Sequence, residues 1–519
     1  MSDQPADPSQ ANPSQADPSQ AQGEAPTDHG AVPFSPPGRY VTTGMLADVQ
    51  ALVAADGRPH EEVAADGAPE ATDRVAGRVM LWRHMGKRLF GTLQDGTGRM
   101  QVSLFRDEMD PDTYRALAKG VRMGDFVGVE GYRYITGKGE PTLGAREVTV
   151  LQRALEPMPD KWAGVHDADI RYRKRYLDLL VNPESRQRFQ VRSAMISFIR
   201  RWLDDQGFME VETPMLTAAA SGAAARPFST HHNALDRDFF LRISPETYLK
   251  RVVAGGFDRV YEIGRNFRNE GIDASHLQEF TMLEWYAAYW DYTDNMEAIR
   301  TLLTATLEAT TGSTTVDHDG VALEFGGQWP VYDYRTLVRD ATGIDLATVR
   351  DVDTLKAEIT SRGIADDLGD TVSYAALVDL LYKRTVRPGL VQPCFLIHHP
   401  AELVPLARRN DDDPNVLDMF QVVVAGWEIV KAYSELVDPI EQEQRLLEQV
   451  ELRAAGDDET MMMEDDFIEA MRHGMPPMSG LGLGIDRLVA LATGAPTLRD
   501  VVLFPLLREA PGDASDVPS

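Results

Sequence analysis

The chain has 519 residues, of which 43% are hydrophobic and 26% are charged, and 81 acidic residues against 52 basic ones give a net charge of −29. This length is too great for one ordinary domain and suits two to four domains. No apolar run is long enough to span a membrane, so an integral membrane protein is excluded. The single cysteine, Cys394, excludes a disulfide scaffold and a cysteine-built zinc site. The acidic balance argues against non-specific DNA coating, although a local basic patch can still bind a nucleic acid.

The amino-terminal segment is predicted to lack a folded core. Residues 6–20 repeat a polar five-residue unit, which has almost nothing to bury. We expect a disordered leader over residues 1–40 and a short helical or irregular segment over residues 41–74. The first 30 residues have neither the basic start nor the apolar core of a secretory signal, so we expect a cytoplasmic protein.

Short alternating segments predict a small β-barrel over residues 75–155. A helix fits between residues 110 and 118, before Gly120. Five short strands with one inserted helix favour an OB-type barrel, a common binder of single-stranded nucleic acids. A purely structural barrel is the alternative. The predicted strands are 75–81, 90–94, 100–105, 126–134 and 148–151.

A larger domain is predicted after a linker over residues 156–170. It covers residues 171–509, with a frayed tail at 510–519. Residues 316–389 mix helical and loop signals, and we interpret them as an insertion. The strand-like runs of this domain are 209–211, 260–269, 279–289, 421–424 and 428–436.

Residues 264–286 carry the most informative pattern in the chain. Side chains alternate faces along a strand, so Arg268 and Glu270 should share a face of the first strand. On the next strand, Phe280, Glu284 and Tyr286 should likewise share a face. An arginine can bind a phosphate or a carboxylate through its planar fork, an aromatic ring can stack on a base, and carboxylates can hold an ammonium group. From spacing alone, a solvated hairpin with cross-strand ion pairs is the alternative.

A glycine-rich segment near the carboxyl end gives a second, weaker signal. Gly480, Gly482 and Gly484 precede a predicted helix over residues 485–491, and Arg487 adds a fixed positive charge. Glycines before a helix allow the backbone to approach a phosphate or a base closely. The spacing fits neither a Walker loop nor a dinucleotide fingerprint, and a structural role is the alternative.

Together these two segments resemble the second and third signature motifs of class II aminoacyl-tRNA synthetases, and residues 207–216 with Pro214 resemble the first. The sequence is most similar to the bacterial-type lysyl-tRNA synthetases of that class. The resemblance implies an α+β fold, with an OB-type anticodon-binding barrel followed by a catalytic domain that has an antiparallel sheet and a helical insertion. It also implies a homodimer. The matching runs occur in order at 171–180, 223–235, 248–251, 265–271, 433–436 and 480–487.

The resemblance implies that lysine is activated by ATP to lysyl-adenylate, with Mg²⁺ as cofactor, and is then transferred to the terminal ribose of a tRNA. Arg268 matches the catalytic arginine that holds the α-phosphate and the lysine carboxylate, and Arg487 matches the one on the γ-phosphate. The other matched ATP contacts are Glu270, His276, Glu428 and the adenine-stacking Phe280.

The resemblance also assigns residues to the amino acid and to the tRNA. Phe90 and Gln101 match residues that stack on and hydrogen-bond to an anticodon base, which agrees with how unpaired RNA bases are recognised. The residues matched to lysine are Gly222, Glu246 and Glu284 at the α-amino end and Tyr286, Tyr433 and Glu435 around the ε-ammonium.

Several departures from the family pattern cluster in one region. Gln421 stands where the family has a metal-binding glutamate, so Glu428 is the one usual metal ligand that remains. Lys431 is open to two hypotheses: its ammonium replaces part of the metal's charge, or it pairs with Glu435 and blocks the ε-ammonium site. Trp427 and Val437 also differ from the pattern. These departures leave open a paralogue with altered amino-acid or acceptor specificity, or a catalytically silent tRNA-binding or regulatory protein.

Overall fold

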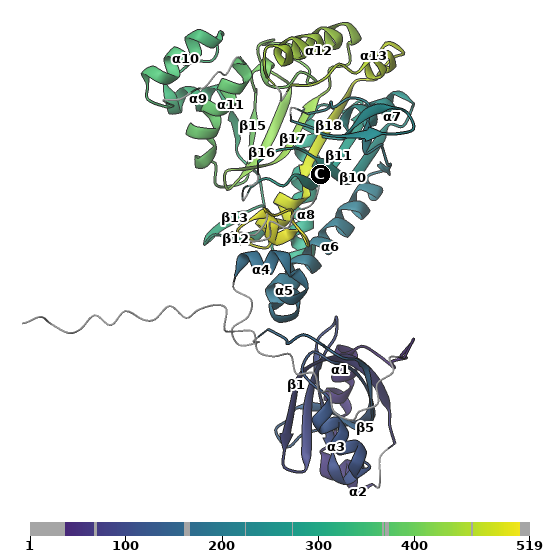
Figure 1. Cartoon of the computed structure of the whole chain (residues 1–519). Helices are drawn as coiled ribbons and strands as arrows, with labels where there is room; N and C mark the ends of the chain where they lie inside the picture. Colours follow the sequence, from purple (N-terminus) through teal and green to yellow (C-terminus); the bar gives the residue numbers. More distant parts are fainter. Residues whose placement is uncertain are drawn as a thin grey trace, which may run out of the picture. The chain divides into compact units, whose positions relative to one another are not determined.

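The computed structural model describes residues 37–508, except 67–69, 160–166, 224, 272, 274, 366–367, 369–372 and 458–459. Most of the predicted leader, part of the linker and all of the predicted tail therefore lie outside the described residues. The chain divides into two compact units, residues 1–163 and residues 164–519 (Figure 1).

The first unit is a closed five-stranded barrel with the strand order β1-β2-β3-β5-β4. Helix α3 (Pro111–Gly120) lies between β3 and β4, so the predicted barrel of five strands with one inserted helix is confirmed. The segment before the barrel contains α1 (Leu46–Asp56) and α2 (His60–Ala65). The strands are β1 (Asp73–Met85), β2 (Arg88–Gln94), β3 (Arg99–Phe105), β4 (Phe126–Ile135) and β5 (Pro141–Gln152).

Alternation along the strands separates the barrel's core from its outer surface. On β2, Leu89 and Leu93 are fully buried in the core, whereas Phe90 between them is only half-buried. The turn between β2 and β3 is held by Asp95, whose carboxylate accepts hydrogen bonds from the backbone N–H groups of Thr97 and Gly98. This side chain also accepts a hydrogen bond from the backbone of Leu46, which anchors the start of α1 on the barrel.

The second unit is built on an eight-stranded sheet with the order β14-β15-β16-β17-β18-β11-β10-β6. The central neighbours are antiparallel, and only the outermost pairs, β14 with β15 and β6 with β10, are parallel. The predicted α+β fold with an antiparallel sheet is therefore confirmed. The strands are β6 (Met209–Glu210), β10 (Arg259–Phe267), β11 (Glu279–Ala288), β14 (Val331–Asp333), β15 (Cys394–Ile397), β16 (Met419–Val424), β17 (Trp427–Ser434) and β18 (Met478–Gly484).

One face of this sheet is apolar and is covered by helices. On β11, Leu283 and Trp285 point into a core shared with α6 (Pro183–Asp205), α8 (Tyr292–Thr311) and α14 (Ile485–Ala492). The intervening side chains of β11, which include Glu284 and Tyr286, point to the opposite face. The helices thus leave one face of the sheet available for a polar cavity.

The predicted insertion has its own helical core but also contributes to the sheet. Helices α9 (Tyr334–Thr342), α10 (Val352–Ser361) and α11 (Tyr374–Thr385) pack around a separate apolar cluster and gather beside β15 in Figure 1. The segment before them forms a small hairpin, β12 (Thr315–His318) and β13 (Val321–Glu324), and then edge strand β14.

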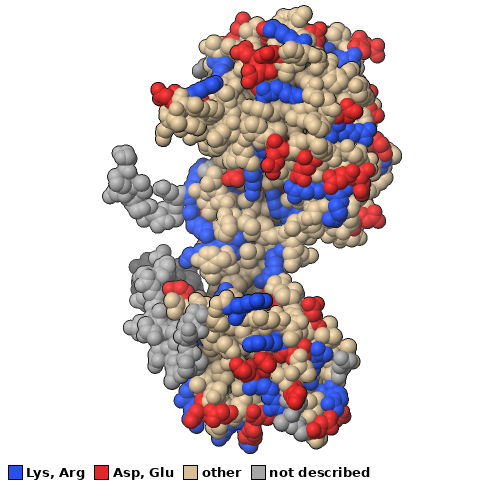
Figure 2. Space-filling view, turned by 90° about the vertical axis from the view of Figure 1, so that its right-hand side faces the viewer, with Lys and Arg blue, Asp and Glu red and all other residues tan. Residues whose placement is uncertain are grey.

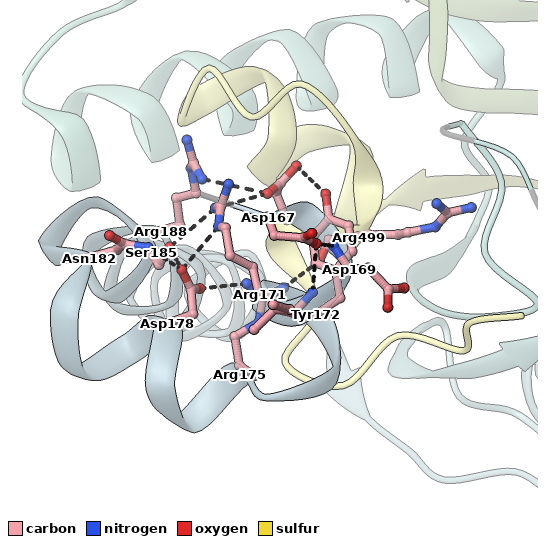
Figure 3. A network of polar contacts seen from close by, with 12 residues as sticks. Asp167, Asp169, Arg171, Tyr172, Arg175, Asp178, Asn182, Ser185, Arg188 and Arg499 are labelled. Atoms are coloured by element: carbon pink, nitrogen blue, oxygen red, sulfur yellow. Dashed lines mark hydrogen bonds and ion pairs between the residues drawn. The ribbon is translucent and has the colours of Figure 1, made fainter. Parts of the chain in front are cut away.

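A buried polar network joins the start of the second unit to its end. Arg175 and Asp178, both fully buried, pair at 2.7 Å on α5 (Arg175–Val181). Arg175 also donates to backbone carbonyls of Arg499 and Val502, at and just after η5 (Leu498–Val501). Arg171 on α4 (Ala168–Arg173) pairs with both Asp178 and Asp500 of η5. Figure 3 shows its side chain among these groups.

On the face that Figure 2 presents, charged side chains of both signs are mixed. Because phosphate affinity depends on the charges near the contact, the net charge of −29 does not prevent phosphate groups from binding locally. None of the helices in the described ranges combines the length and the apolar composition needed to cross a bilayer.

Candidate active site

A cavity of about 260 Å³ lies on the polar face of the sheet, over β11, β17 and β18. It gathers side chains that the sequence spreads from Gly222 to Arg487. The residues assigned to substrates by resemblance that line it are Gly222, Glu246, Arg268, Glu270, His276, Phe280, Glu284, Tyr286, Glu428, Tyr433 and Arg487. Glu435 lies at its border, because its Oε1 atom packs against Gly480, which lines the cavity.

Two arginines mark one end of the cavity. Arg268 follows the end of β10, where its backbone N–H donates to the carbonyl of Gln278, and its guanidinium lies 5.1 Å from the centre of the Phe280 ring. Arg487 lies in the first turn of α14 and donates from Nη1 to the backbone carbonyl of Glu428 at 2.6 Å. Two fixed positive charges beside an aromatic ring suit a nucleotide with several phosphates.

The loop between β10 and β11 is organised by Asp273. Its carboxylate accepts hydrogen bonds from the backbone N–H groups of Ser275 and His276 and contacts the His276 ring nitrogen Nδ1 at 2.7 Å. Burial opposes the effect, but these bonds lower the pKa of Asp273 to about 2. Arg499 on η5 donates to the Asp273 carbonyl, so the same loop is supported from the carboxyl end of the chain.

The sequence reasoning missed the residue that fixes Arg487. The adjacent Asp486 is buried, and its carboxylate pairs with Arg192 of α6 at 2.5 Å and accepts the backbone N–H of Thr281 on β11 at 2.7 Å. These contacts set the start of α14 against the sheet and therefore the direction of Arg487. An acid in the first helical turn was the available signal, since it favours the positive end of the helix dipole.

Three buried carboxylates mark the other end of the cavity: Glu246 on α7 (Glu246–Ala254), Glu284 on β11 and Glu435 after β17. Ser244 donates to Glu284 at 2.9 Å, and the Tyr433 hydroxyl donates to Glu246 at 2.6 Å. Burial and the neighbouring Glu246 raise the pKa of Glu284 to about 8. Burial likewise raises the pKa of Glu435. Such a cluster has a strong preference for cationic groups.

A fourth buried group, Lys250, was also missed. Its ammonium lies 2.7 Å from Glu246 Oε1 and 2.5 Å from Glu435 Oε2, and its side chain is fully buried. The hypothesis that Lys431 pairs with Glu435 is wrong, because Lys250 holds that carboxylate and no ion pair joins Lys431 to it among the described residues. Lys431 instead lines the cavity. The four-residue spacing of Glu246 and Lys250 on a helix was a signal that could have found this pair.

A β-bulge brings Glu428 to the cavity. Val422 pairs with Val430 whereas Val423 pairs with Glu428, so Ile429 is an extra residue in β17. Without this shift, Glu428 and Lys431, which are three apart, would point to opposite faces. The bulge therefore places a carboxylate and an ammonium on the same wall.

The donor set fits one Mg²⁺ that is held mainly by phosphates, and it does not fit a cage made by the protein alone. Gln421 faces Glu428, and its Nε2 donates to the Glu428 carboxylate, so the amide is a hydrogen-bond partner of that carboxylate. Within the described part of the chain, no three His, Cys, Asp or Glu side chains converge on a metal site. Mg²⁺ commonly uses one or two carboxylates together with substrate phosphates, and Glu428 offers one carboxylate on the cavity wall.

The barrel places Phe90 and Gln101 on its outer surface. On adjacent strands, Phe90 lies opposite Ser103 and Gln101 lies opposite Thr92, so Phe90 and Gln101 are diagonal neighbours on one face. The amide nitrogen of Gln101 donates to Thr142 at 2.8 Å, which fixes the orientation of its side chain. An aromatic ring beside a fixed amide can stack on a base and bond to its edge.

Comparison with known proteins identifies the family. Residues 167–508 match the sequence profile of tRNA synthetases class II (D, K and N), and residues 74–151 match that of the OB-fold nucleic acid binding domain. The chain belongs to the class II tRNA synthetases. The first match spans more than half of the chain, and together the two matches cover both structural units.

Several curated relatives of this class II synthetase are named lysine–tRNA ligase. The protein from Pelotomaculum thermopropionicum is 44% identical over 434 residues, which cover 84% of this chain and 86% of the relative. The protein from Escherichia coli (strain K12) is 45% identical over 454 residues, covering 87% and 89%. The protein from Chloroflexus aurantiacus is 44% identical over 443 residues, covering 85% and 90%.

Proposed function

We propose that this class II synthetase is a lysine–tRNA ligase, which activates lysine with ATP and transfers it to the terminal ribose of tRNA(Lys). The observation that carries the proposal is the distribution of charge along the cavity over β11, β17 and β18. Two arginines and an aromatic ring mark one end, and three buried carboxylates mark the other. A molecule with two ammonium groups matches the acidic end, and a triphosphate nucleotide matches the basic end. The relatives' shared name supports the same assignment.

The first reaction needs no covalent intermediate on the protein. A carboxylate oxygen of lysine attacks the α-phosphorus of ATP, the bond from that phosphorus to the bridging oxygen breaks, and pyrophosphate leaves. We assign Arg268 to the α-phosphate and the lysine carboxylate and Arg487 to the γ-phosphate, with Phe280 under the adenine. Glu270 and His276 are further ATP contacts. Catalysis then consists of aligning the two reactants and neutralising the charge that develops.

The amino acid is held by its two ammonium groups. We assign the α-ammonium to Gly222 and Glu284, together with Glu246, and the ε-ammonium to Glu435 and Tyr286, with Tyr433 as an aromatic wall. A buried carboxylate that is left without its cation is costly, so this end rejects side chains that lack a terminal positive charge.

Mg²⁺ bound by Glu428 and the ATP phosphates would supply additional positive charge at the phosphate end. Lys431, which lines the cavity on the same strand, supplies part of that charge from the protein itself. This division of charge predicts that Lys431→Asn needs a higher Mg²⁺ concentration for half-maximal ATP–pyrophosphate exchange. An unchanged Mg²⁺ requirement in the variant would contradict this role.

Transfer to tRNA uses both units of the chain. We assign Phe90 and Gln101 to an anticodon base, while the adenylate remains in the catalytic cavity. A hydroxyl of the terminal ribose attacks the lysyl carbonyl carbon, and AMP leaves. A tRNA ligase acts where translation occurs, so the proposed compartment is the cytoplasm.

A homodimer is part of the proposal. Met209, Met215 and Leu216 lie at and after β6, in the segment that resembles the first signature motif, and each is at least 39% exposed. Large apolar side chains exposed together favour a protein–protein contact. Light scattering during size-exclusion chromatography should give twice the chain mass, whereas a monomer at micromolar concentration would contradict the proposal.

The deciding experiment is ATP–pyrophosphate exchange with each of the twenty amino acids, followed by charging of tRNA with labelled lysine. We expect exchange that depends on lysine and transfer to tRNA(Lys). Exchange with another amino acid would instead identify a paralogue. Absence of exchange with every amino acid, together with tRNA binding, would identify a silent RNA-binding protein.

A further inference from the structure

The acidic end of the cavity contains its own cation. Lys250 projects from α7 between two of the three carboxylates, 2.7 Å from Glu246 and 2.5 Å from Glu435. Its ammonium lies 5.7 Å from the centres of the Tyr433 and Phe467 rings. Lys250 does not itself line the cavity, so it stands behind Glu246, which does, and Glu435, which lies at the border. A bound amino acid would meet these carboxylates and not Lys250.

The charges at this end divide into two groups. Glu246, Lys250 and Glu435 form one group, whose ionised charges sum to one negative unit. Glu284 forms the second, and it is held separately by Ser244 at 2.9 Å. A lysine molecule presents two separate ammonium groups, so each group of charges can be neutralised by one of them.

Lys250 also decides which oxygen remains for a ligand. Glu435 Oε2 faces the Lys250 ammonium, whereas Oε1 packs beside Gly480 and Tyr286. Both oxygens are buried and make no hydrogen bond among the described residues, but Oε2 has an ion-pair partner in Lys250, whereas Oε1 is in no ion pair with a described residue. A buried acceptor without a partner is costly, so it favours a donor arriving from the cavity.

We propose that Lys250 is a specificity-determining positioning residue for the terminal ammonium of the amino acid. By holding Glu246 and one oxygen of Glu435, it leaves a single oxygen and a single negative charge for one monovalent cation. Without Lys250, two adjacent buried carboxylates would share a proton or take up a second cation, and their preference for the substrate ammonium would fall. This inference rests on the proposed activation of lysine.

The test replaces Lys250 and follows two substrates separately. In Lys250→Met, which keeps the length of the side chain and removes its charge, KM for lysine in ATP–pyrophosphate exchange should rise at least thirtyfold, while KM for ATP stays within about twofold. The preference for lysine over norleucine, which has the same carbon chain without the terminal ammonium, should fall. The matched control is Lys383→Met. It removes an exposed lysine of α11 that pairs with Asp379, four residues earlier in the same helix.

A second variant keeps the test decisive if Lys250→Met does not fold. In Lys250→Met/Glu246→Gln the charge of the first group is again one negative unit, on Glu435. The double variant removes the repulsion between the two adjacent carboxylates, Glu246 and Glu435, that Lys250→Met alone would leave. The double variant should fold, and its preference for lysine over norleucine should exceed that of Lys250→Met. If Lys250→Met does not fold, the double variant should still prefer lysine at least tenfold.

Two results would overturn the inference. One is an unchanged KM for lysine in Lys250→Met, and the other is loss of the lysine preference in the double variant although it binds ATP normally. Failure of the proposed function is distinguishable, because it would appear as absent lysine-dependent exchange in the unsubstituted protein.

Discussion

At the scale of single residues, two glycines of β18 leave room for the side chains around the cavity. A Cβ atom at Gly480 would collide with Glu435 Oε1 and with the Tyr286 ring, the two groups that we assign to the ε-ammonium. A Cβ atom at Gly482, two residues further along β18, would press only on the flexible Cε end of Met282, at 3.0 Å, because Glu284 Cγ and the Lys431 carbonyl lie at ordinary contact distances of 3.8 and 3.9 Å. Gly480 therefore leaves space for the two groups assigned to the ε-ammonium, whereas Gly482 does not contact them.

Gly480→Ala should raise KM for lysine more than Gly482→Ala does. Overpacking a tight site costs roughly 1–3 kcal/mol, which corresponds to about 5- to 150-fold in KM. Exchange kinetics with lysine and ATP varied in turn would measure both variants. Equal effects of the two substitutions on KM for lysine would show that Gly480 is not a contact of the amino-acid end.

Glu284 should make lysine binding depend on pH. Burial and Glu246 raise the pKa of Glu284 to about 8, so below that pH the free protein carries a proton on this carboxyl group. An arriving α-ammonium favours the ionised carboxylate, and the proton must leave on binding. The affinity for lysine should therefore rise as the pH rises from 6 to about 8, by up to about tenfold per pH unit.

Calorimetry in buffers with different ionisation heats would measure the affinity and the released proton together. Glu284→Gln should bind lysine more weakly and should lose the pH dependence over this range. Affinity that stays constant between pH 6 and 8 in the unsubstituted protein would count against the assignment of Glu284 to the α-ammonium.

The same raised pKa sets a direction for stability without ligand. In the unfolded chain a glutamate has an ordinary pKa of 4.5, so between about pH 4.5 and pH 8 the folded state binds more protons than the unfolded state. The contribution of Glu284 to the free energy of unfolding therefore falls as the pH rises through this window. Binding of lysine offsets this loss, which couples folding of the acidic end to its substrate.

At the scale of elements, the buried arginine network connects the amino- and carboxyl-terminal parts of the catalytic unit. Arg175 pairs with Asp178 and donates to carbonyl groups near η5. From η5, Arg499 donates to Asp273 in the loop that carries His276. The packing of α5 therefore supports a loop of the active site far along the chain.

Arg175→Met should destabilise the catalytic unit by about 3–5 kcal/mol, because it leaves Asp178 buried without its partner. Urea denaturation followed by tryptophan fluorescence would measure the change. The matched control, Arg339→Met, removes one arginine of an exposed pair with Asp340 and should cost less than about 1 kcal/mol. Similar losses in both variants would show that burial of the Arg175 pair contributes nothing.

At the scale of the whole molecule, two units with separate cores divide the proposed work. The barrel has its own apolar cluster, and the sheet of the catalytic unit has another. A change on the barrel surface should therefore leave the catalytic cavity intact. This separation allows recognition of tRNA to be tested apart from activation of the amino acid.

Phe90→Ala should raise KM for tRNA in charging by about 5- to 150-fold, which corresponds to the roughly 1–3 kcal/mol typical of stacking on one base. Lysine-dependent ATP–pyrophosphate exchange should not change. Phe126→Ala is the matched control, since Phe126 is an exposed phenylalanine of the same barrel that lies under Arg78. If both variants charge tRNA as the unsubstituted protein does, the anticodon assignment fails.

The alternation of side chains was the most reliable guide from the sequence to the site. It predicted that Phe280, Glu284 and Tyr286 share a face, and all three line the cavity. Alternation alone does not describe β17, because the bulge at Ile429 turns Glu428 to the face that Lys431 occupies. A bulge depends on the partner strand, so a single strand read alone does not reveal it.

The sequence by itself determined the two-unit organisation, the α+β class and the set of residues that meet in the cavity, since local periodicity and ordered motifs are properties of the chain. The tertiary structure decided which charges compensate one another. Lys250 and Glu435 are distant in the sequence, and only the tertiary packing, in which α7 lies against β10 and β11, brings them to 2.5 Å. Because burial strengthens every interaction between charges, these distances determine the charge balance of the acidic end.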